Sequence, residues 1–562
     1  MNTEKKGIAL LAQICAAKGV EHVVISPGSR NAPLTIAFTC QESFEIINIP
    51  DERSAAFFAL GIAQATNVPV VLICTSGSAA LNYAPAIAEA FYQRVPLLVL
   101  SSDRPEELID QGEGQSIRQF GIYDNFIRAS YRFPQLSVSD NELNYARRII
   151  SEGLDKCIQP IHGPVHINVP LDEPLYGRSS EELKDFSPST SMSIDRKISS
   201  ESEQIIKDTW DRSEKVMVLL GGHSPDPVLN KLLSKFNLDP YVAVLTETNA
   251  NVHGLNYSHH IDLALSAIST KDQDYYAPDL LITFGENIIS KKIKAWIREH
   301  KPKEHWHVDP EMKHYDTFQC LTHHIPIDPL EFLRQFEPKS LNENSTYSDD
   351  WKCASQEALE ATLEFTNTAP YSDLKVLGKI HEQIPSNYRV HYANSTSVRY
   401  AQLFPHREDL KYFANRGTSG IDGCTSTAAG HALASKSPTL LITGDMAFFY
   451  DSNALWNHHL SEHLRIIMIN NDGGNIFRII DGPESTGQLE QHFEAKHNTG
   501  AEHLAKTYNV PYYFCDDMNG IADTLPKFFG KQNGRPAILE IKTPNEISAE
   551  TLRGLFKALE QE

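Results

Sequence analysis

The sequence predicts an α/β protein made of three doubly wound domains, each built on a parallel sheet. Short, almost wholly apolar segments alternate with helical patterns along the chain, as expected of parallel strands that are buried on both faces. Two polar stretches, residues 178–202 and 337–350, interrupt this alternation and are predicted to be linkers. The resulting domains have the usual size and comprise residues 1–177, 203–336 and 351–562.

Each predicted strand ends in a turn that is rich in Gly, Ser or Asp. The strands of the first domain are residues 23–25, 70–74, 97–100 and 165–169. Those of the second are residues 216–220, 241–245, 280–284 and 305–308. Those of the third are residues 390–392, 439–443, 466–469 and 538–541. Ligands of doubly wound sheets bind at the carboxyl ends of the strands, so functional side chains are expected in these turns.

Composition excludes several classes of partner. The 562 residues include 51 Lys+Arg and 72 Asp+Glu, a formal net charge of −21, and no dense basic run that would bind nucleic acid. No apolar stretch approaches the ~20 residues of a membrane-spanning helix. The charged residues Lys5 and Lys6 precede an apolar segment, but Glu4 and Gln13 favour an amphipathic helix over a signal peptide. The eight scattered cysteines contain no Cys-x-x-Cys, and a cytoplasmic protein is expected.

Two strand-end turns in the last domain contain hard oxygen ligands. Residues 443–446 (Thr-Gly-Asp-Met) and residues 470–474 (Asn-Asn-Asp-Gly-Gly) each follow an apolar strand. A carboxylate, an amide oxygen and a backbone carbonyl suit octahedral Mg²⁺, and glycines let the backbone approach phosphates. Each turn alone is a common loop sequence. Together, at two strand ends, they predict a site for a metal and a diphosphate.

This pair of turns resembles the thiamine diphosphate (ThDP) signature, Gly-Asp-Gly followed by Asn-Asn, with Met446 in place of the third glycine. The resemblance implies that Mg²⁺ or Mn²⁺ is bound by the side chains of Asp445 and Asn471 and by the carbonyl of Gly473. Further cofactor contacts implied in this region are those of Gly444, Met446, Asn475 and Ile476.

An acidic pair in the first domain supplies the candidate activating carboxylate. Asp51 and Glu52 follow the strand-like run 46–49 and open an Ala-rich helix. Acidic residues at such a position also cap a helix and interact with its dipole. Because ThDP needs a carboxylate beside N1′ of its aminopyrimidine, and relatives have it at this point of the first domain, Glu52 is assigned that role.

Other turns are assigned to the cofactor by the same resemblance. Residues 75–78 follow a strand and open a helix, which alone indicates only a tight turn. In the Gly-rich segment 419–423, Ile421 fits the bulky side chain that holds ThDP in its bent form, although core packing is its alternative role. The cofactor contacts implied here are Thr75, Ser76, Gly77, Asn394, Ser419, Gly420 and Ile421.

Four stretches narrow the family. They are residues 25–30, residues 102–108 together with 115–119, residues 394–399, and residues 415–423. With the metal signature, they resemble the 2-succinyl-5-enolpyruvyl-6-hydroxy-3-cyclohexene-1-carboxylate synthases of menaquinone biosynthesis. The resemblance implies a transferase that decarboxylates 2-oxoglutarate and adds the succinyl carbanion equivalent to isochorismate. The fold it implies has pyrimidine-binding, middle and diphosphate-binding domains.

Arginines in these stretches match the anionic substrates, because guanidinium groups bind carboxylates bidentately. For any one of them, a surface ion pair is the alternative. The middle domain offers Lys291 and Lys292, where the family has Lys-Arg and where a solvated helix face is the alternative. The implied substrate-binding residues are Ser29, Arg30, Arg104, Gln115, Lys291, Lys292, Ser395, Arg399, Arg416, Ile476 and Phe477.

Two other functions are alternatives to this one. Another ThDP-dependent 2-oxoacid decarboxylase or carboligase, similar to acetolactate synthase, shares the metal signature but needs fewer arginines. A non-catalytic ThDP-binding regulator is disfavoured because Glu52, Asp445 and Asn471 are all present. Relatives build the site between two chains, so a homodimer or homotetramer is expected. Residues 458–463 hold three histidines on a predicted helix, which favours a polar face over a metal site.

Overall fold

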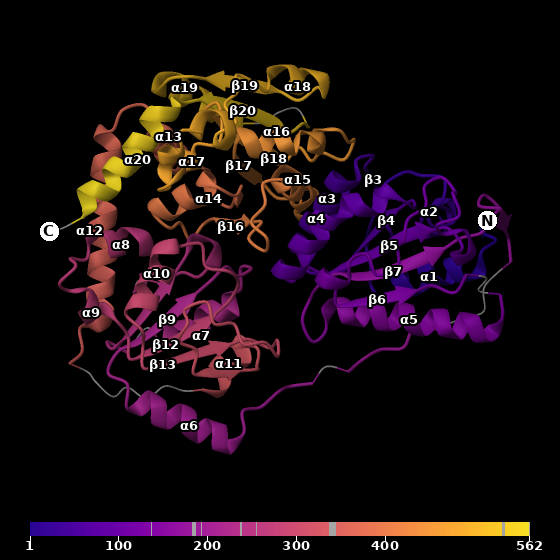
Figure 1. Ribbon diagram of the computed structural model, residues 1–562, viewed down its shortest axis with the longest axis horizontal. Coiled ribbons are helices and arrows are strands. Elements are labelled where there is room, and N and C mark those ends of the chain that lie inside the picture. The colour runs from indigo at the N-terminus through magenta and orange to yellow at the C-terminus, as the bar shows by residue number, and fades with distance from the viewer. Residues whose placement is uncertain are drawn as a thin grey trace.

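The computed structural model describes residues 1–560 except 136–137, 182–186, 193, 237–238, 255, 337–343 and 531–533. It contains three six-stranded sheets in which all neighbouring strands are parallel, each in its own domain (Figure 1). Helices cover both faces of each sheet, which confirms the predicted α/β fold of three doubly wound domains. Among the described helices none is long and apolar enough to cross a bilayer.

The N-terminal sheet has the strand order β3-β2-β4-β5-β7-β6. Its strands are β2 (His22–Ile25), β3 (Glu45–Asn48), β4 (Val70–Cys74), β5 (Leu97–Asp103), β6 (Ala129–Arg132) and β7 (Val165–Pro170). One face is covered by α1 (Lys6–Ala17), α2 (Ala32–Thr39) and α5 (Asp140–Ile158). The other is covered by α3 (Glu52–Thr66) and α4 (Ser78–Gln93). A short antiparallel pair, β1 (Asn2–Thr3) with β8 (Arg178–Ser179), joins the two ends of this domain.

The middle sheet has the order β11-β10-β9-β12-β13-β14. Its strands are β9 (Val216–Leu220), β10 (Val242–Thr246), β11 (Tyr257–Ser258), β12 (Leu280–Phe284), β13 (Glu304–Val308) and β14 (His323–Ile325). One face packs on α6 (Ser200–Asp211), α7 (Pro227–Phe236) and α11 (Pro329–Gln335). The other packs on α8 (Ile261–Ala267), on α10 (Lys291–Glu299) and on the start of α12 (Tyr347–Thr368), with α9 (Gln273–Tyr276) beside them.

The C-terminal sheet has the order β16-β15-β17-β18-β20-β19. Its strands are β15 (Arg389–Tyr392), β16 (Lys411–Ala414), β17 (Thr439–Gly444), β18 (Leu464–Asn470), β19 (Tyr512–Cys515) and β20 (Ala537–Lys542). One face packs on α13 (Asp373–Gln383), α14 (Thr396–Tyr400), α19 (Met518–Phe529) and α20 (Asn545–Leu559). The other packs on α15 (Cys424–Ser435), α16 (Asp445–Tyr450) and α18 (Glu502–Thr507), and α17 (Ile476–Ile479) lies at its carboxyl edge.

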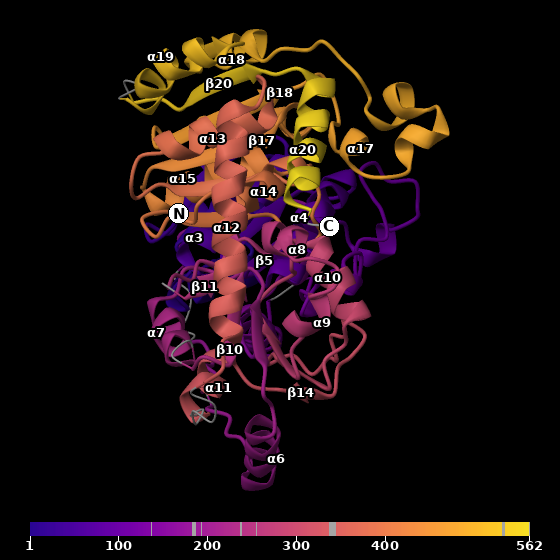
Figure 2. The same cartoon turned by 90° about the vertical axis from the view of Figure 1, so that its left-hand side faces the viewer.

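Helix α12 belongs to two cores at once. It begins at Tyr347, inside the stretch 337–350 that was predicted to be a linker. Its residue Trp351 packs in the core of the middle domain and Ala358 packs in that of the C-terminal domain. The helix therefore runs along both domains and joins them rigidly (Figure 2).

The N-terminal and C-terminal domains meet where α3 crosses α15. A Cβ atom at Gly61 would collide with the backbone oxygen of Thr427, and one at Gly430 would collide with that of Phe58. The two helix backbones therefore touch with no side chain between them. Because α3 and α15 pack into a single apolar cluster, the two domains share one core.

We expect Gly61→Ala to destabilise the protein, because its methyl group must push two helix backbones apart. Overpacking of this kind costs about 3 kcal/mol of unfolding free energy, measurable by urea denaturation. Gly153→Ala in α5 is the control, since its Cβ would meet ordinary contacts at 3.5 Å from Val165. It should leave stability unchanged or higher. Equal stability of the two variants would contradict the close approach of α3 and α15.

Candidate active site

The N-terminal domain places several predicted residues at the carboxyl ends of β2 and β5. Arg30 is buried and donates from a terminal nitrogen to the backbone oxygen of Leu171 at 3.0 Å. Ser29 precedes it and is exposed. Arg104 donates from Nε and from a terminal nitrogen to the backbone oxygen of Gly114 at 2.9 and 2.7 Å. Both guanidinium groups are thus held at this edge of the sheet.

The turn after β4 lies beside them. Ser76 Oγ donates to the backbone oxygen of Gln115 at 2.8 Å. The Gly77 N–H donates to Gln119 Oε1 at 3.1 Å, and Gly77 has a φ of +84° that favours glycine. The Thr75 hydroxyl is buried without a protein partner. A buried hydroxyl of this kind is available to a ligand.

Glu52 is the first residue of α3, and Asp51 caps the helix by accepting from the Ser54 N–H at 2.9 Å. Burial is the main reason why the pKa of Glu52 is raised above its ordinary value. On either side of it, Asp51 Oδ2 accepts from Asn453 Nδ2 at 2.7 Å, and Arg53 donates to the backbone oxygen of Tyr450 at 2.6 Å. These contacts fix the start of α3 against the C-terminal domain.

In the C-terminal domain, the turns after β17 and β18 meet. Asp445 begins α16 and is buried, and its Oδ2 accepts from the Gly473 N–H at 3.0 Å. Its Oδ1 accepts from the Met446 N–H at 2.6 Å. His497 Nε2 lies 3.4 Å from Asp445 Oδ2. The two predicted metal-binding turns are therefore in direct contact.

Asn471 presents an unused oxygen at this point. Its Nδ2 donates to Asp373 Oδ2 at 2.9 Å, and Thr543 Oγ1 donates to Asp373 Oδ1 at 2.6 Å. This orients the amide so that Oδ1 is buried with no protein partner. In the described chain no cluster of three or more His, Cys, Asp or Glu residues could hold a metal ion. A carboxylate with an unpaired amide oxygen and a nearby carbonyl nevertheless fits a hard cation such as Mg²⁺.

Other residues of this region are placed as follows. Asp472 forms an ion pair with Lys542 Nζ, which neutralises its charge. Asn475 Nδ2 donates to the backbone oxygen of Asn545 at 3.0 Å, and its Oδ1 is buried without a partner. Ile476 begins α17, directly after the turn that was predicted to bind a metal, and Phe477 follows it.

Asn394 ties two C-terminal turns together. Its Nδ2 donates to the backbone oxygens of Asn415 and Gly420, both at 2.6 Å. Its Oδ1 accepts from a terminal nitrogen of Arg416 at 3.0 Å. Ile421, in the second turn, is only partly buried and packs against the shared core. Ser395, next to Asn394, has a φ value of +75°, and Ser419, next to Gly420, has one of +63°.

Arg399 and Arg416 each have a hydrogen-bond donor for which the described protein supplies no acceptor. The Nε of each is buried without a protein partner. In the part of the chain that the structure describes, no carboxylate forms an ion pair with either. Burial is the main cause that lowers the pKa of Arg416, with a smaller effect from Arg399, while Glu247 and Glu89 oppose the shift. These guanidinium groups are therefore free to bind an anion.

The middle domain reaches this region through the start of α10. Lys291 is exposed, and Lys292 Nζ donates to Ser266 Oγ at 2.5 Å and lies 4.2 Å above the ring of Phe556. Lys294, which sequence reasoning missed, donates to the backbone oxygen of Ile288 at 2.5 Å. Burial is the main cause that lowers the pKa of Lys294; Glu247 opposes the shift, and Arg416, Arg298 and Arg399 add to it. This lysine therefore lies within electrostatic range of Arg399 and Arg416.

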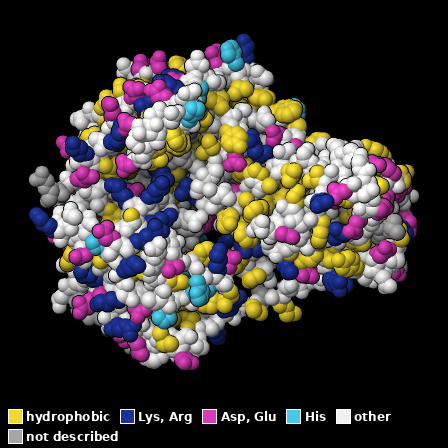
Figure 3. Space-filling view, in the orientation of Figure 1, with side chains coloured by type: hydrophobic (Ala, Val, Ile, Leu, Met, Phe, Trp, Pro, Cys, Tyr) yellow, Lys and Arg dark blue, Asp and Glu magenta, His cyan; other side chains and the backbone are white. Residues whose placement is uncertain are grey.

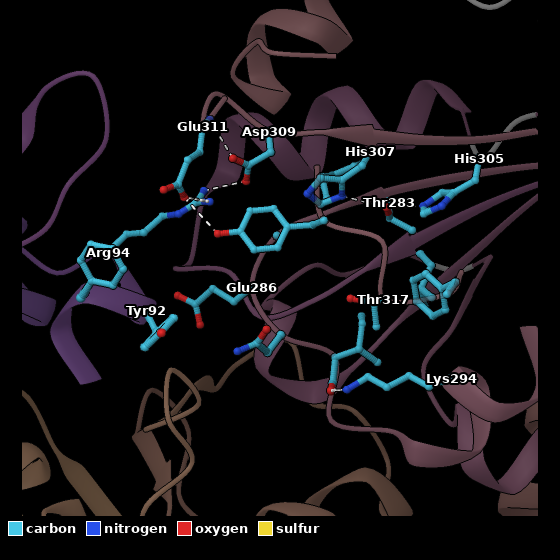
Figure 4. Close-up of a pocket in the computed structure, with 18 residues that line it drawn as sticks. Tyr92, Arg94, Thr283, Glu286, Lys294, His305, His307, Asp309, Glu311 and Thr317 are labelled. Atoms are coloured by element: carbon cyan, nitrogen blue, oxygen red, sulfur yellow. Dashed lines mark hydrogen bonds and ion pairs between the residues drawn. The ribbon is translucent and has the colours of Figure 1, made fainter. Parts of the chain in front are cut away.

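A cavity of about 120 Å³ lies between the N-terminal and middle domains. Figure 4 shows Arg94 reaching from the end of α4 toward Asp309 and Glu311 of the middle domain. The Arg94–Asp309 ion pair measures 2.7 Å. Glu286 and Lys294 also line the cavity. No motif in the sequence predicted this contact, because its two halves lie far apart in the chain.

The predicted residues thus form two groups. One is at the carboxyl edge of the N-terminal sheet and includes Glu52, and the other is at the carboxyl edge of the C-terminal sheet and includes Asp445. In the described ranges, no hydrogen bond or ion pair joins Glu52 to Asp445, Asn471 or Gly473.

Comparisons with known proteins identify the class of enzyme. Residues 5–122 match the family profile "Thiamine pyrophosphate enzyme, N-terminal TPP binding domain", and residues 243–391 match "Middle domain of thiamine pyrophosphate". Thiamine pyrophosphate is another name for ThDP. The fold, the strand-end turns and these matches define a ThDP-dependent enzyme.

Curated relatives cover nearly the whole chain. A protein of Flavobacterium johnsoniae is 40% identical over 558 residues, covering 98% of both chains. One of Flavobacterium psychrophilum is 41% identical with the same coverage, and one of Desulfotalea psychrophila is 39% identical, covering 96% of this chain and 98% of its own. All three are named 2-succinyl-5-enolpyruvyl-6-hydroxy-3-cyclohexene-1-carboxylate synthase. The chain belongs to this family of menaquinone-biosynthesis enzymes.

The buried carboxyl group of Glu247 predicts that the stability of the protein depends on pH. Burial raises its pKa from 4.5 to about 7, although its carboxylate accepts from the N–H groups of Ile289 and Ser290 at 2.7 and 2.6 Å. The folded protein therefore binds a proton that the unfolded chain releases. The resulting stabilisation is complete below pH 4.5 and is lost as the pH rises through 7.

We expect the difference in unfolding free energy between wild type and Glu247→Gln to fall by about 3 kcal/mol from pH 4.5 to pH 8. Urea denaturation at a series of pH values measures it. Glu357→Gln, at an exposed position of α12, is the control and should give a difference that does not vary with pH. Parallel curves for wild type and Glu247→Gln would contradict the raised pKa.

Proposed function

We propose that this enzyme decarboxylates 2-oxoglutarate and adds the succinyl group to isochorismate. The products are CO₂ and 2-succinyl-5-enolpyruvyl-6-hydroxy-3-cyclohexene-1-carboxylate, the compound named in its relatives. The observation that carries the proposal is the pair of guanidinium groups, Arg399 and Arg416, whose Nε atoms are buried and unpartnered. Both substrates are dicarboxylates, and unpaired guanidinium groups in a partly buried site select such anions.

Asp445, Asn471 and Gly473 would hold a divalent cation, Mg²⁺ or Mn²⁺, that binds the diphosphate of ThDP. The unpartnered Asn471 Oδ1 and the buried Asp445 carboxylate support this assignment. Gly444, Asn394 and the turn 419–421 would contact the rest of the cofactor. When bound, ThDP would supply a nucleophilic carbon and, in its thiazolium ring, an electron sink for the decarboxylation.

The side chains of this protein bind, orient and protect the reactants. Glu52, whose pKa is raised mainly by burial, would hydrogen-bond N1′ of the aminopyrimidine. The substrate carboxylates would be held by Arg399 and Arg416, with Ser395 beside them. Ile476 and Phe477 would form an apolar wall that limits access of water.

We infer that a complete site needs two chains, in a homodimer or a homotetramer. Ser29, Arg30, Arg104, Gln115 and Glu52 would then be supplied by one chain, and the cation-binding turns by its partner. Among the described residues, no hydrogen bond or ion pair joins Glu52 to Asp445, Asn471 or Gly473 within one chain, which supports this. Helix α4 also exposes Leu81 and Tyr92 by 49% and 48%, and apolar side chains gather on the N-terminal domain in Figure 3.

The reaction is tested by incubating the protein with ThDP, Mg²⁺, 2-oxoglutarate and isochorismate. We expect CO₂ release and the coupled product, both detected by mass spectrometry. Pyruvate in place of 2-oxoglutarate is the matched control and should release CO₂ at least 100-fold more slowly, because it has no second carboxylate for the arginines. Turnover of pyruvate without turnover of 2-oxoglutarate would favour an acetolactate-synthase-like enzyme instead.

The two-chain site is tested by complementation. We expect Glu52→Gln to bind ThDP but to lose most of its activity, and Asp445→Asn to bind Mg²⁺–ThDP weakly in calorimetry. When the two inactive variants are unfolded together and refolded as a mixture, heterodimers contain one intact site. About a quarter of wild-type activity should return. Without recovery, although both variants refold and associate, each chain must build its site alone.

A further inference from the structure

A buried carboxylate of the N-terminal domain binds the backbone of the turn that contains Arg416. Glu89, on α4, is 1% exposed. Its Oε1 accepts from the Gly417 N–H at 2.7 Å and from Gln93 Nε2 at 2.8 Å. Its Oε2 accepts from the N–H and the hydroxyl of Thr418, at 2.7 and 2.5 Å. Both oxygens are therefore fully used, and three of the four donors belong to the other domain.

Neighbouring groups hold the same turn. Gln93 Nε2 also donates to the backbone oxygen of Ala414 at 2.8 Å. From the middle domain, Asn287 Nδ2 donates to the backbone oxygen of Arg416 at 3.1 Å. A Cβ atom at Gly417 would lie 2.7 Å from the backbone oxygen of Glu89, so α4 and the turn are in backbone contact. All three domains thus meet at residues 414–418.

The backbone on both sides of Arg416 is fixed, whereas its guanidinium group is not neutralised. Among the described residues, the guanidinium donates one hydrogen bond to a side chain, that to Asn394 Oδ1 at 3.0 Å. Glu89 binds the amides that follow Arg416 and favours the charged guanidinium at longer range. This arrangement holds the arginine in place without occupying the donors that an anion needs.

We propose that Glu89 is a positioning residue for substrate binding, which sets the backbone of the Arg416 turn across the interface between the N-terminal and C-terminal domains. The proposal rests on the substrate-binding role of Arg416 proposed above. Only a carboxylate accepts all of these hydrogen bonds, because an amide at position 89 would direct N–H groups at the N–H donors of the turn. Loss of the carboxylate leaves buried N–H groups unpaired and lets the turn shift.

The test compares Glu89→Gln with Arg416→Lys in the full ThDP–Mg²⁺ enzyme. Arg416→Lys should raise the KM for one of the two substrates, 2-oxoglutarate or isochorismate. We expect Glu89→Gln to raise the KM for that same substrate about tenfold. Its kcat should fall less than threefold. Its Kd for ThDP should rise less than its KM, because Asp445 and Asn471 lie on other turns and only residues 419–421 of the proposed cofactor contacts adjoin the displaced backbone.

Asp309→Asn is the matched control for stability. Asp309 is also a buried carboxylate at a domain interface, 3% exposed, and it pairs with Arg94 at 2.7 Å. Among the hydrogen bonds of the described residues, it makes none to the 414–418 turn. It should lower the melting temperature as Glu89→Gln does, but leave both KM values within twofold. Equal KM changes in the two variants would overturn the proposal, because a general loss of interface stability would explain them.

A double-mutant cycle separates positioning from an independent effect. Glu89→Gln combined with Arg416→Lys should have nearly the KM of Arg416→Lys alone, since both changes disable the same contact. Full additivity would overturn the proposal. A KM that rises in Arg416→Lys but not in Glu89→Gln would overturn the role of Glu89 only. Unchanged KM values in Arg416→Lys would refute the substrate-binding role of Arg416 as well.

If Glu89→Gln does not fold, Thr418→Val tests the same contact. This variant removes one hydrogen bond to Glu89 Oε2 and keeps both backbone donors. KM for the same substrate should rise about threefold, less than in Glu89→Gln, because part of the contact remains. A KM equal to that of wild type in a folded Thr418→Val would count against the proposal.

Discussion

The backbone contact between α3 and α15 is the constraint on which the placement of the other parts depends. Two glycines, Gly61 and Gly430, remove every side chain from the crossing, so the distance between the helices has little freedom. Both helices lie beside residues with proposed roles: α3 begins at Glu52, and α15 follows the turn of Ile421. The crossing therefore sets where Glu52 and Ile421 lie. It also aligns α4 with the Arg416 turn.

The charges around Arg399 and Arg416 explain how these two guanidinium groups lie close together in a protein with a net charge of −21. Burial and the charge of Arg399 both disfavour the charge of Arg416, yet no described carboxylate forms an ion pair with either arginine. Glu247 and Glu89 compensate from behind, where each binds backbone N–H groups instead of guanidinium groups. Charge is thus balanced at a distance, while the donors remain available to an anion. Net charge limits nonspecific partners, but the local balance determines the ligand.

The sequence predicted the centre of each sheet and missed most of the edges. The predicted strands correspond to the four central strands of every sheet, which are apolar on both faces. Edge strands β6, β11, β14, β16 and β19 were missed, since edges are short or half exposed and have mixed composition. The segment 458–463, predicted to be helical, is an irregular turn before β18.

The strand-end turns of the candidate site were predictable for the same reason, because they follow central strands. Glu89, Asn287 and Lys294 were not predictable, because their partners are distant in sequence and no local pattern marks them.

These three residues also bear on how far the domains depend on one another. The cores of the three domains are joined, by α3 with α15 and by α12, and the turn of Arg416 is also held by all three domains. An isolated C-terminal domain would lose the partners of α15 and the support of Arg416. The working unit of this enzyme is therefore larger than any of its domains, and its linkers do not mark places where function can be divided.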